Sequence, residues 1–289
     1  MAQKYEVGLY RSMSASKKAL DIVAPLLRKN DVYTQSPYSK EPSDPPRRII
    51  VVGGEGINRI RFQDLYDKGE VRPVGIVGGG TQNVLHRELM DLKRTMTLEE
   101  FMETPWDRFP INTFFKPGQV GGAIFNNQYG LGVWERANGR ENAMLRRSNE
   151  TEDETRKRVR RARYHAFLFR SILRISDRFD MYSVTPHTGG VNAFPEQDIT
   201  SDEVTRAWIE GNPIEQVVKL AITLNTFRKG DIPPESILRR EKAKSFNVTI
   251  GSRKHDTAWI DGDTVPNPAS GEAVIARANV AIPVVAIVK

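Results

Sequence analysis

The sequence predicts an α/β domain followed by a β-rich second half. In the first half, short β-branched runs alternate with segments of helical periodicity, which is typical of a parallel sheet whose strands are joined by helices. From residue 111 onward, apolar runs are instead broken by Gly and Asn, and several C-terminal segments have the composition of strands. With 289 residues, the chain has room for two domains with separate cores.

The first elements are predicted as strand, loop and helix. Residues 5–10 form a short extended run, and residues 17–27 carry apolar side chains three and four positions apart. Residues 31–34 are predicted as a second short strand. Residues 35–46 are rich in Ser, Pro and charge, which disfavours a helix, so we expect a loop there.

Two apolar runs are predicted as buried parallel strands that end in glycine turns. Residues 49–52 lead into glycines 53–54, and residues 74–77 lead into glycines 78–80, before a helical pattern at 84–92. In a parallel sheet the carboxyl ends of the strands meet at one edge, where the ligand crevice lies. We therefore expect both turns on that crevice.

The two glycine turns predict a site for a phosphate or a nucleotide. Glycine lets backbone N–H groups approach a phosphate closely, and the N-terminus of a following helix adds partial positive charge. One such turn could be only a tight connection, but two turns on successive strands converge on one place. Neither the P-loop pattern nor the six-residue dinucleotide fingerprint is present.

The second half is predicted as mostly strands with two helical segments. Charged residues dominate 149–163, and helical spacing follows in 164–175 and again in 215–227. The segments with strand character are 120–133, 246–250, 257–260, 273–276 and 281–288.

Composition narrows the possible chemistry. The absence of cysteine excludes thiol nucleophiles, Cys-ligated zinc, iron–sulfur clusters and disulfides, and it fits a reducing cytosol. The 43 Lys and Arg residues exceed the 36 Asp and Glu residues, so the net charge of +7 favours an anionic partner. The four histidines lack ligand spacing, so a histidine metal site or a Ser-His-Asp triad has little support. No long apolar stretch or signal-peptide pattern is present, and we expect a cytoplasmic protein.

Several motifs resemble those of the diacylglycerol kinase catalytic-domain family, which includes bacterial lipid kinases and sphingosine kinases. GGEGINRI at 53–60 and PVGIVGGGTQNVLHREL at 73–89 resemble its GGDGT and P-x-G-T-x-N-D-x-A-R segments. RSMSA at 11–15 is similar to its N-P-x-S-G phosphate loop, and WIDGD at 259–263 to its D-G-E motif. Without the resemblance, WIDGD is equally well explained as an acidic hairpin turn.

The resemblance implies two domains. The first is a Rossmann-like nucleotide-binding α/β domain over residues 1–112, of the type shared by NAD kinases and diacylglycerol kinases. The second is a β-sandwich domain for the lipid substrate over residues 113–281, and the last strand, at about 282–289, would return to the first domain. ATP would lie in the cleft between the domains, with Mg²⁺ on its phosphates.

The resemblance also implies a reaction and its residues. The enzyme would be a phosphotransferase that moves the γ-phosphate of ATP to an alcohol group of a diacylglycerol-like or sphingoid lipid, with a role in phospholipid metabolism. Asp263 stands at the proton acceptor, Asp261 at the second catalytic acid of that motif, and Asp202 at a magnesium ligand. The residues implied for the ATP site are Ser14, Lys17, Thr34, Gly53, Gly54, Glu55, Gly56, Ile57, Gly80, Thr81 and Asn83.

Departures from the family pattern keep two alternatives open. GGDGT has become GGEGI, which lengthens the acid at Glu55 and replaces a threonine by Ile57. The family's G-x-D-A aspartate falls on Trp134, next to Glu135. The chain could therefore be a nucleotide-binding protein with impaired catalysis, or a soluble kinase of the related NAD kinase fold.

A lipid substrate at an anionic membrane surface is the expected partner, so the protein would be peripheral at the inner membrane face. The basic cluster at 156–163 is either such a surface or a solvated helix side paired with the acids at 150–154. No nucleic-acid module is recognisable, so no nucleic-acid partner is expected. The sequence leaves a homodimer open.

Overall fold

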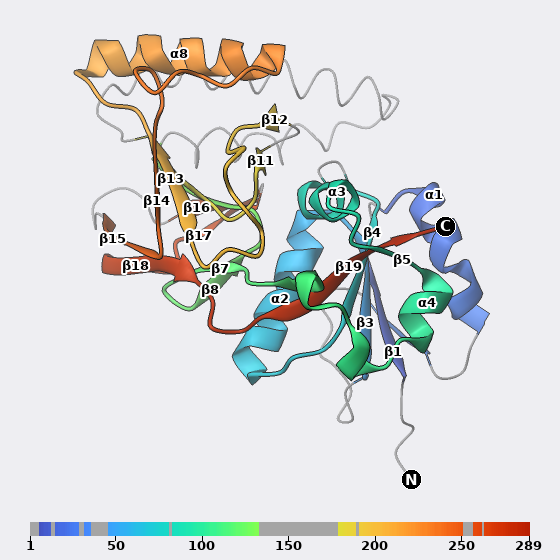
Figure 1. Ribbon diagram of the computed structural model, residues 1–289. Helices are drawn as coiled ribbons and strands as arrows, with labels where there is room; N and C mark the ends of the chain where they lie inside the picture. The colour runs from blue at the N-terminus through green and yellow to red at the C-terminus, as the bar shows by residue number, and fades with distance from the viewer. Residues whose placement is uncertain are drawn as a thin grey trace. The chain divides into compact units, whose positions relative to one another are not determined.

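A computed structural model of the chain describes residues 6–12, 15–28, 32–35, 46–80, 83–132, 179–188, 191–250, 257–261 and 263–289 (Figure 1). The chain divides into two compact units. Unit 1 comprises Met1–Pro117, Ile199–Asp202 and Ala278–Lys289, and unit 2 comprises Gly118–Asp198 and Glu203–Arg277. From the sequence we expected a boundary near residue 112, and we did not expect the short stretch 199–202 of unit 1.

Unit 1 is built on a sheet of mainly parallel strands. Its main path has the order β2-β1-β3-β4-β19-β5, with all neighbours parallel, and β6 pairs antiparallel with β19. The last strand of the chain, β19, thus lies between β4 and β5. The strands are β1 Val7–Arg11, β2 Val32–Gln35, β3 Arg48–Gly53, β4 Val74–Gly78, β5 Thr95–Thr97, β6 Phe114–Phe115 and β19 Ile282–Val288.

Helices cover both faces of this sheet. Figure 1 shows α2 on one side of the strands and α1 and α4 on the other. Ala19 and Val23 of α1 and Phe101 of α4 share a core with Val7 and Ile50 of the sheet. Because both faces are covered, every residue of 49–52 is fully buried, which confirms the buried parallel strand predicted there. The helices of unit 1 are α1 Lys17–Val23, α2 Glu55–Lys68, α3 Val84–Asp91 and α4 Leu98–Glu103.

The order of the strands reverses between β1 and β3. The chain runs from β1 to β2 on one side of β1, and it then continues with β3 on the other side. In open parallel sheets, ligands bind outside the carboxyl ends of the strands at this kind of switch point. Ser12 follows β1 there and Gly54 follows β3, so the first glycine turn lies at the switch point.

The sequence did not reveal α2, because its inward face mixes apolar and polar residues. Phe62 and Leu65 are buried on it, but so are Asn58 and Arg61. The guanidinium of Arg61 lies 4.3 Å from the ring centroid of Tyr10, a cation–π geometry that accommodates the buried charge.

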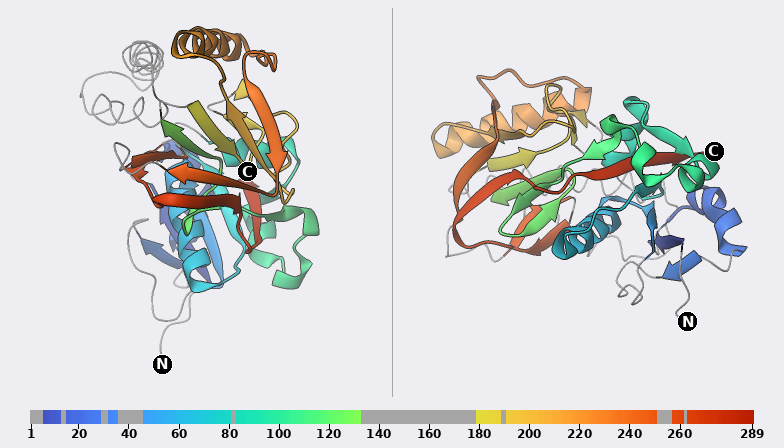
Figure 2. Two further views of the ribbon diagram at one scale, coloured as in Figure 1. Left: turned by 90° about the vertical axis from the view of Figure 1, so that its left-hand side faces the viewer. Right: turned by 60° about the horizontal axis from the view of Figure 1, so that its bottom comes forward.

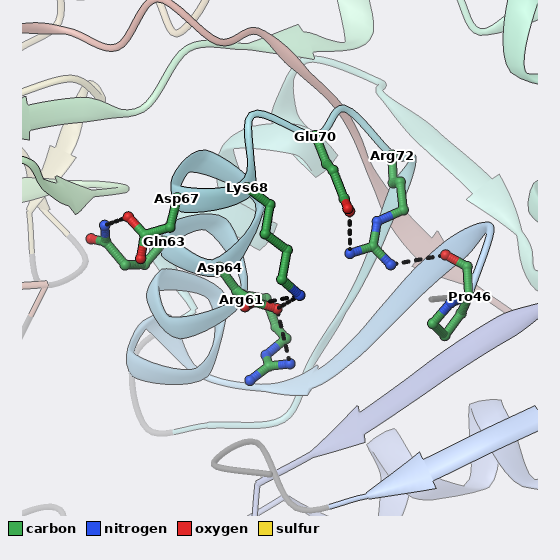
Figure 3. Close-up of polar contacts among 8 residues, drawn as sticks. All are labelled: Pro46, Arg61, Gln63, Asp64, Asp67, Lys68, Glu70 and Arg72. Atoms are coloured by element: carbon green, nitrogen blue, oxygen red, sulfur yellow. Dashed lines mark hydrogen bonds and ion pairs between the residues drawn. The ribbon is translucent and has the colours of Figure 1, made fainter. Parts of the chain in front are cut away.

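Polar contacts fix the outer side and the end of α2 (Figure 3). The Nζ atom of Lys68 lies 3.2 Å from a carboxylate oxygen of Asp64, one turn earlier. Beyond the helix, Arg72 pairs with Glu70 at 2.9 Å and donates to the carbonyl of Pro46, also at 2.9 Å. Arg72 thus ties the connection after α2 to the chain that enters β3.

The described part of unit 2 contains two larger antiparallel sheets and a two-stranded one, β11-β12, as the β-rich second half predicts. The larger has the order β14-β13-β10-β9-β16-β17 and the smaller β15-β18-β7-β8. Its strands are β7 Gly118–Val120, β8 Ala123–Phe125, β9 Gln128–Gly132, β10 Phe179–Ser183, β11 His187–Thr188, β12 Val191–Asn192, β13 Val204–Trp208, β14 Arg239–Ala243, β15 Ser245–Ile250, β16 Thr257–Ile260, β17 Asp263–Pro266 and β18 Gly271–Arg277.

The larger sheet has a core on each face. On one face, the ring of Tyr182 in β10 lies 5.6 Å from that of Phe246 in β15, so aromatic side chains join the two sheets. On the other face, Met181 packs with Leu220 and Phe227 of α8 (Pro213–Lys229). Adjacent residues of a strand point to opposite faces, which explains why β10 serves both cores. Among the described residues, no helix is long and apolar enough to cross a membrane.

Candidate functional site

Three connections of unit 1 meet at the carboxyl ends of β1, β3 and β4. Ser16 donates its backbone N–H to the carbonyl of Gly79 at 3.1 Å, and Gly79 donates its own N–H to the carbonyl of Gly53 at 3.0 Å. The connection after β1 is thus tied to the one after β4, which is tied to the one after β3. We call this place the glycine junction; it comprises Ser12, Ser16, Gly53, Gly54, Gly79 and Gly80.

The junction requires glycine because the backbones touch. A Cβ atom on Gly80 would lie 2.5 Å from the Cα atom of Gly54 and 2.6 Å from its nitrogen. A Cβ atom on Gly79 would lie 2.9 Å from the Cβ atom of Ala19. The two glycine turns therefore converge, as their positions after successive strands predict.

Two helices begin at the glycine junction. α2 starts at Glu55, directly after Gly54, and its first backbone hydrogen bond runs from the N–H of Asn58 to the carbonyl of Gly54. Helix geometry therefore directs the N–H groups of residues 55–57 out of the N-terminal end. α3 starts at Val84, directly after the second turn. A helix N-terminus carries partial positive charge, so this arrangement suits an anion such as a phosphate.

Asn83 closes the second glycine turn. Its Oδ1 atom accepts the N–H of Gly80 at 3.0 Å, and its Nδ2 atom donates to the carbonyl of the same residue at 3.0 Å. The side-chain amide thus holds Gly80 at its close approach to Gly54. Asn83 was expected in the ATP site, and the geometry gives it a role in positioning the turn.

Glu55 joins the starts of the two helices. Its Oε1 atom accepts the backbone N–H of Leu85, in the first turn of α3, at 2.8 Å, and the side chain is only 3 % exposed. The first-turn amides of a helix lack acceptors within the helix, so Glu55 caps α3 from α2. The acid of the GGEG motif therefore helps to build the junction.

The other residues expected at the ATP site lie at different places in the fold. Ile57 is buried, and its Cγ2 atom lies 2.8 Å from the position of a Cβ on Gly53, so it packs beneath the turn. Lys17 is exposed at the start of α1, and Gly56 is the second residue of α2. Thr34 pairs with Leu9 in β2, the edge strand of the sheet. Ser14 and Thr81 lie outside the described residues.

Sequence reasoning missed Ser12 and Ser16. Ser12 extends the pairing of β1 by donating its N–H to the carbonyl of Val52 at 2.9 Å. Ser16 is the N-cap of α1, and its Oγ atom accepts the N–H of Ala19 at 3.3 Å. A serine directly before a helical pattern is a capping signal that could have identified Ser16.

His86 in α3 packs beside the junction. A Cβ atom on Gly78 would lie 2.8 Å from the Nδ1 atom of His86, so the imidazole occupies the space that this glycine leaves. Burial lowers the pKa of His86, and a hydrogen bond with the backbone of Ile287 opposes this shift. The imidazole is therefore neutral at physiological pH.

Asp261 of unit 2 lies in the tight turn between β16 and β17. Ile260 pairs with Asp263, so Asp261 lies in the tight connection between these paired residues, and it has a φ of 51°. The hairpin explanation of WIDGD is thus correct for the backbone. The Asp261 carboxylate accepts the backbone N–H groups of Asn126, Asn127 and Gln128 at 2.7, 2.8 and 3.0 Å.

These contacts distinguish the two acids of the motif. Asp261 is 4 % exposed, and its own N–H donates to the carbonyl of Gln128 at 3.0 Å, so it clamps the turn to the start of β9. These contacts give the carboxylate a structural role in holding the turn, and its expected catalytic role stays a prediction. Asp263 begins β17 at the end of this clamped turn. Its catalytic role stays a prediction.

Asp202, the expected magnesium ligand, pairs with a lysine. Its Oδ1 atom lies 2.5 Å from the Nζ atom of Lys116, and both residues belong to unit 1. Within the described ranges, no group of three acidic, histidine or cysteine side chains could hold a metal ion. The described residues therefore do not fit a preformed magnesium site, and Mg²⁺ stays a prediction. Trp134, Glu135 and the basic cluster at 156–163 lie outside the described residues.

Solved structures similar to the chain include three of diacylglycerol kinases or candidate diacylglycerol kinases from Bacillus anthracis. Two solved structures of candidate diacylglycerol kinases from Bacillus anthracis str. Sterne share 14 % and 16 % identity with the chain, with TM-scores of 0.59 and 0.56. A third structure, of a diacylglycerol kinase from the same organism, has 15 % identity and a TM-score of 0.58. Each match covers 98 % of both chains. No protein-family model matches the sequence, and no curated protein is significantly similar to it.

These similarities establish the fold. The chain has the fold of these diacylglycerol kinase structures. This finding confirms, at the level of fold, the resemblance that the glycine motifs and the WIDGD motif indicate.

Proposed function

We propose that this protein is an ATP-dependent lipid kinase, which transfers the γ-phosphate to an alcohol group of a diacylglycerol-like or sphingoid lipid. The observation that carries the proposal is the glycine junction at the switch point of a parallel sheet. Gly54 and Gly80 have no side chains and their backbones touch, so the backbone at this edge can approach a ligand closely. The N-terminus of α2 at this edge favours negative charge, as the phosphates of ATP require, whereas the first turn of α3 is capped by the carboxylate of Glu55.

In this proposal, the residues of unit 1 bind and orient the nucleotide. The backbone N–H groups of residues 55–57, at the start of α2, and the exposed ammonium of Lys17 interact with the phosphates. Asn83 and Glu55 keep the turns and helices in position, so little rearrangement is needed when the nucleotide binds. Phosphoryl transfer depends mainly on such positioning and on electrostatic stabilisation.

Asp263 is the proposed proton acceptor. The lipid hydroxyl oxygen forms a bond to the γ-phosphorus as the bond from that phosphorus to the β–γ bridging oxygen breaks, and ADP leaves. The carboxylate of Asp263 takes the hydroxyl proton. The clamp at Asp261 supports this assignment, because it fixes the turn that carries Asp263 and leaves Asp261 itself occupied.

A nucleotide-binding protein with impaired catalysis is the second candidate. Two acids expected to act on ATP or magnesium have other partners, because Glu55 caps α3 and Asp202 pairs with Lys116. Ile57 is a buried apolar residue, so its side chain offers no hydroxyl to a phosphate. This candidate predicts ATP binding without turnover.

The test is transfer of labelled γ-phosphate from ATP and Mg²⁺ to dioctanoylglycerol in mixed micelles, comparing the wild type with Asp263→Asn. We expect the variant to lose transfer while its ATP affinity stays nearly intact, because Asp263 acts on the acceptor. Full activity of the variant would refute the role of Asp263. ATP binding without transfer in the wild type would favour the second candidate.

A further inference from the structure

Asn126 and Gln128 of unit 2 carry side-chain amides that are buried without a partner. Both residues are 0 % exposed. Among the described residues, they are the only two whose buried side-chain amide lacks a hydrogen-bond partner at both its nitrogen and its oxygen. A buried polar group without a partner lowers the stability of a protein, and natural proteins keep such groups chiefly where function requires them.

Asn127, which lies between these two residues, has partners for its side chain and its backbone. Its Oδ1 atom accepts a hydrogen bond from the hydroxyl of Thr185, and its carbonyl accepts the N–H of Val184 at 3.0 Å. The backbone N–H groups of residues 126–128 are all held by the carboxylate of Asp261. The backbone of this connection between β8 and β9 is therefore fixed, although two of its side-chain amides have no partner.

Gln128 belongs to a buried polar row that crosses the larger sheet. Gln128 pairs with Ser183 of β10, and Ser183 pairs with Thr205 of β13, so the three side chains lie on one face. Figure 2 shows β9, β10 and β13 side by side. The Ser183 hydroxyl donates to the carbonyl of Thr185 at 2.8 Å, and the Thr205 hydroxyl donates to Gln197. Two members of the row thus have partners within the protein, whereas the amide of Gln128 has none.

An alcohol is the chemical group that matches such an amide. A primary amide has N–H donors and an oxygen acceptor, and a hydroxyl group accepts from the first and donates to the second. An ionised phosphate only accepts hydrogen bonds and an ammonium group only donates them. Either ion would therefore leave one end of each amide without a partner.

We infer that Asn126 and Gln128 bind the hydroxyl-bearing head group of the acceptor. The inference rests on the proposed function, because it assigns these amides to the acceptor of the transferred phosphate. Asp261, two residues before Asp263, donates its N–H to the carbonyl of Gln128 at 3.0 Å and accepts that of Asn126 at 2.7 Å. The two amides and the proposed proton acceptor thus belong to one clamped part of unit 2.

The experiment measures the binding of dihexanoylglycerol to the full chain without ATP, together with the melting temperature. Asn126→Leu and Gln128→Met replace each amide by an apolar group of similar size. Each variant should bind the lipid at least about tenfold more weakly. Its melting temperature should equal or exceed that of the wild type, because no hydrogen bond of the side chain within the protein is lost. A short-chain sphingosine is measured in parallel, and the lipid whose binding falls in the variants is the acceptor.

Two controls separate a binding role from a structural one. Asn127→Leu removes the hydrogen bond with Thr185, so it should lower the melting temperature. Thr223 of α8 has a buried hydroxyl without a partner, and Thr223→Val should leave lipid binding unchanged. If Asn126→Leu does not fold, Asn126→Ser is measured in its place.

The inference fails if the variants at 126 and 128 bind both lipids as the wild type does, if Thr223→Val loses as much binding as they do, or if the wild type binds neither lipid. The kinase proposal has a separate readout, which is the transfer of phosphate from ATP to the same lipids. Binding that depends on Asn126 and Gln128, without transfer by the wild type, would support the inference and count against the proposed function alone.

Discussion

The carboxylate of Glu55, in the first turn of α2, accepts a 2.8 Å hydrogen bond from the backbone N–H of Leu85, in the first turn of α3. This contact spans the two helices that begin at the glycine junction. It explains how the longer acid of GGEG is used in this chain: its carboxylate reaches the amide of a neighbouring helix.

Shortening this acid should separate the two helix starts. Glu55→Asp shortens the side chain by one methylene, so the carboxylate no longer reaches the backbone N–H of Leu85. The variant therefore loses a buried hydrogen bond to a charged group. We expect a loss of about 2 kcal/mol in the free energy of unfolding. Urea denaturation measures it, with Glu99→Asp in the exposed first turn of α4 as the control. Equal stability of Glu55→Asp and the wild type would show that the contact contributes nothing.

A methyl group at Gly80 should weaken nucleotide binding. The Cβ atom of Gly80→Ala would lie 2.5 Å from Gly54, so the two turns must move apart. We expect the variant to bind ATP at least about tenfold more weakly, which corresponds to a loss of about 1.4 kcal/mol of binding free energy. Isothermal titration calorimetry measures the dissociation constant for ATP.

The control for this variant is Gly69→Ala. Gly69 ends α2 with a φ of 63° and has open space around its Cβ position, so alanine there costs stability through the backbone alone. Its ATP affinity should match that of the wild type. If both variants bind ATP normally, the junction is not the nucleotide site.

Of the two acids in the WIDGD motif, we expect Asp261 to contribute to stability and Asp263 to contribute little to it. In Asp261→Asn, an NH₂ group replaces one carboxylate oxygen that accepts backbone N–H groups, which we expect to cost about 2 to 3 kcal/mol of stability. Asp263→Asn should leave the melting temperature nearly unchanged. A stable Asp261→Asn variant would contradict the clamp.

His86 should make the stability of the protein depend on pH. Because burial lowers its pKa in the folded state, the unfolded chain binds the proton more readily. Stability is therefore full above a pH of about 6.5, the ordinary pKa of histidine, and it falls as the pH decreases through and below that value. Thermal melting of the wild type and His86→Gln between neutral and acidic pH measures this, and the variant should show a smaller loss. Parallel curves would exclude His86 as the cause.

The sequence predicts the core of unit 1 and the meeting of its glycine turns. Residues 49–52 and 74–77 are apolar runs bounded by glycines, and in a parallel sheet their ends can only lie at one edge. The pattern of an apolar run followed by glycine is local in the sequence. It can therefore be recognised without knowing the tertiary contacts.

Other features depend on contacts between distant residues. α2 lacks helical periodicity because Asn58 and Arg61 lie on its buried face, where Tyr10 from β1 accommodates the arginine. The clamp at Asp261 needs the amides of residues 126–128, more than a hundred positions earlier. Lys116, the partner of Asp202, is also remote in sequence, at a separation of 86 positions. No local sequence pattern predicts such contacts between distant residues.

The central claim is that this chain phosphorylates a lipid. The most direct measurement supplies the wild-type protein with γ-labelled ATP and Mg²⁺, together with micelles of diacylglycerol, monoacylglycerol, sphingosine or phosphatidylglycerol, and NAD in a parallel reaction. We predict labelled lipid in at least one micelle and no labelled NADP. Labelled NADP alone, or no labelled product from a protein that still binds ATP, would contradict the claim.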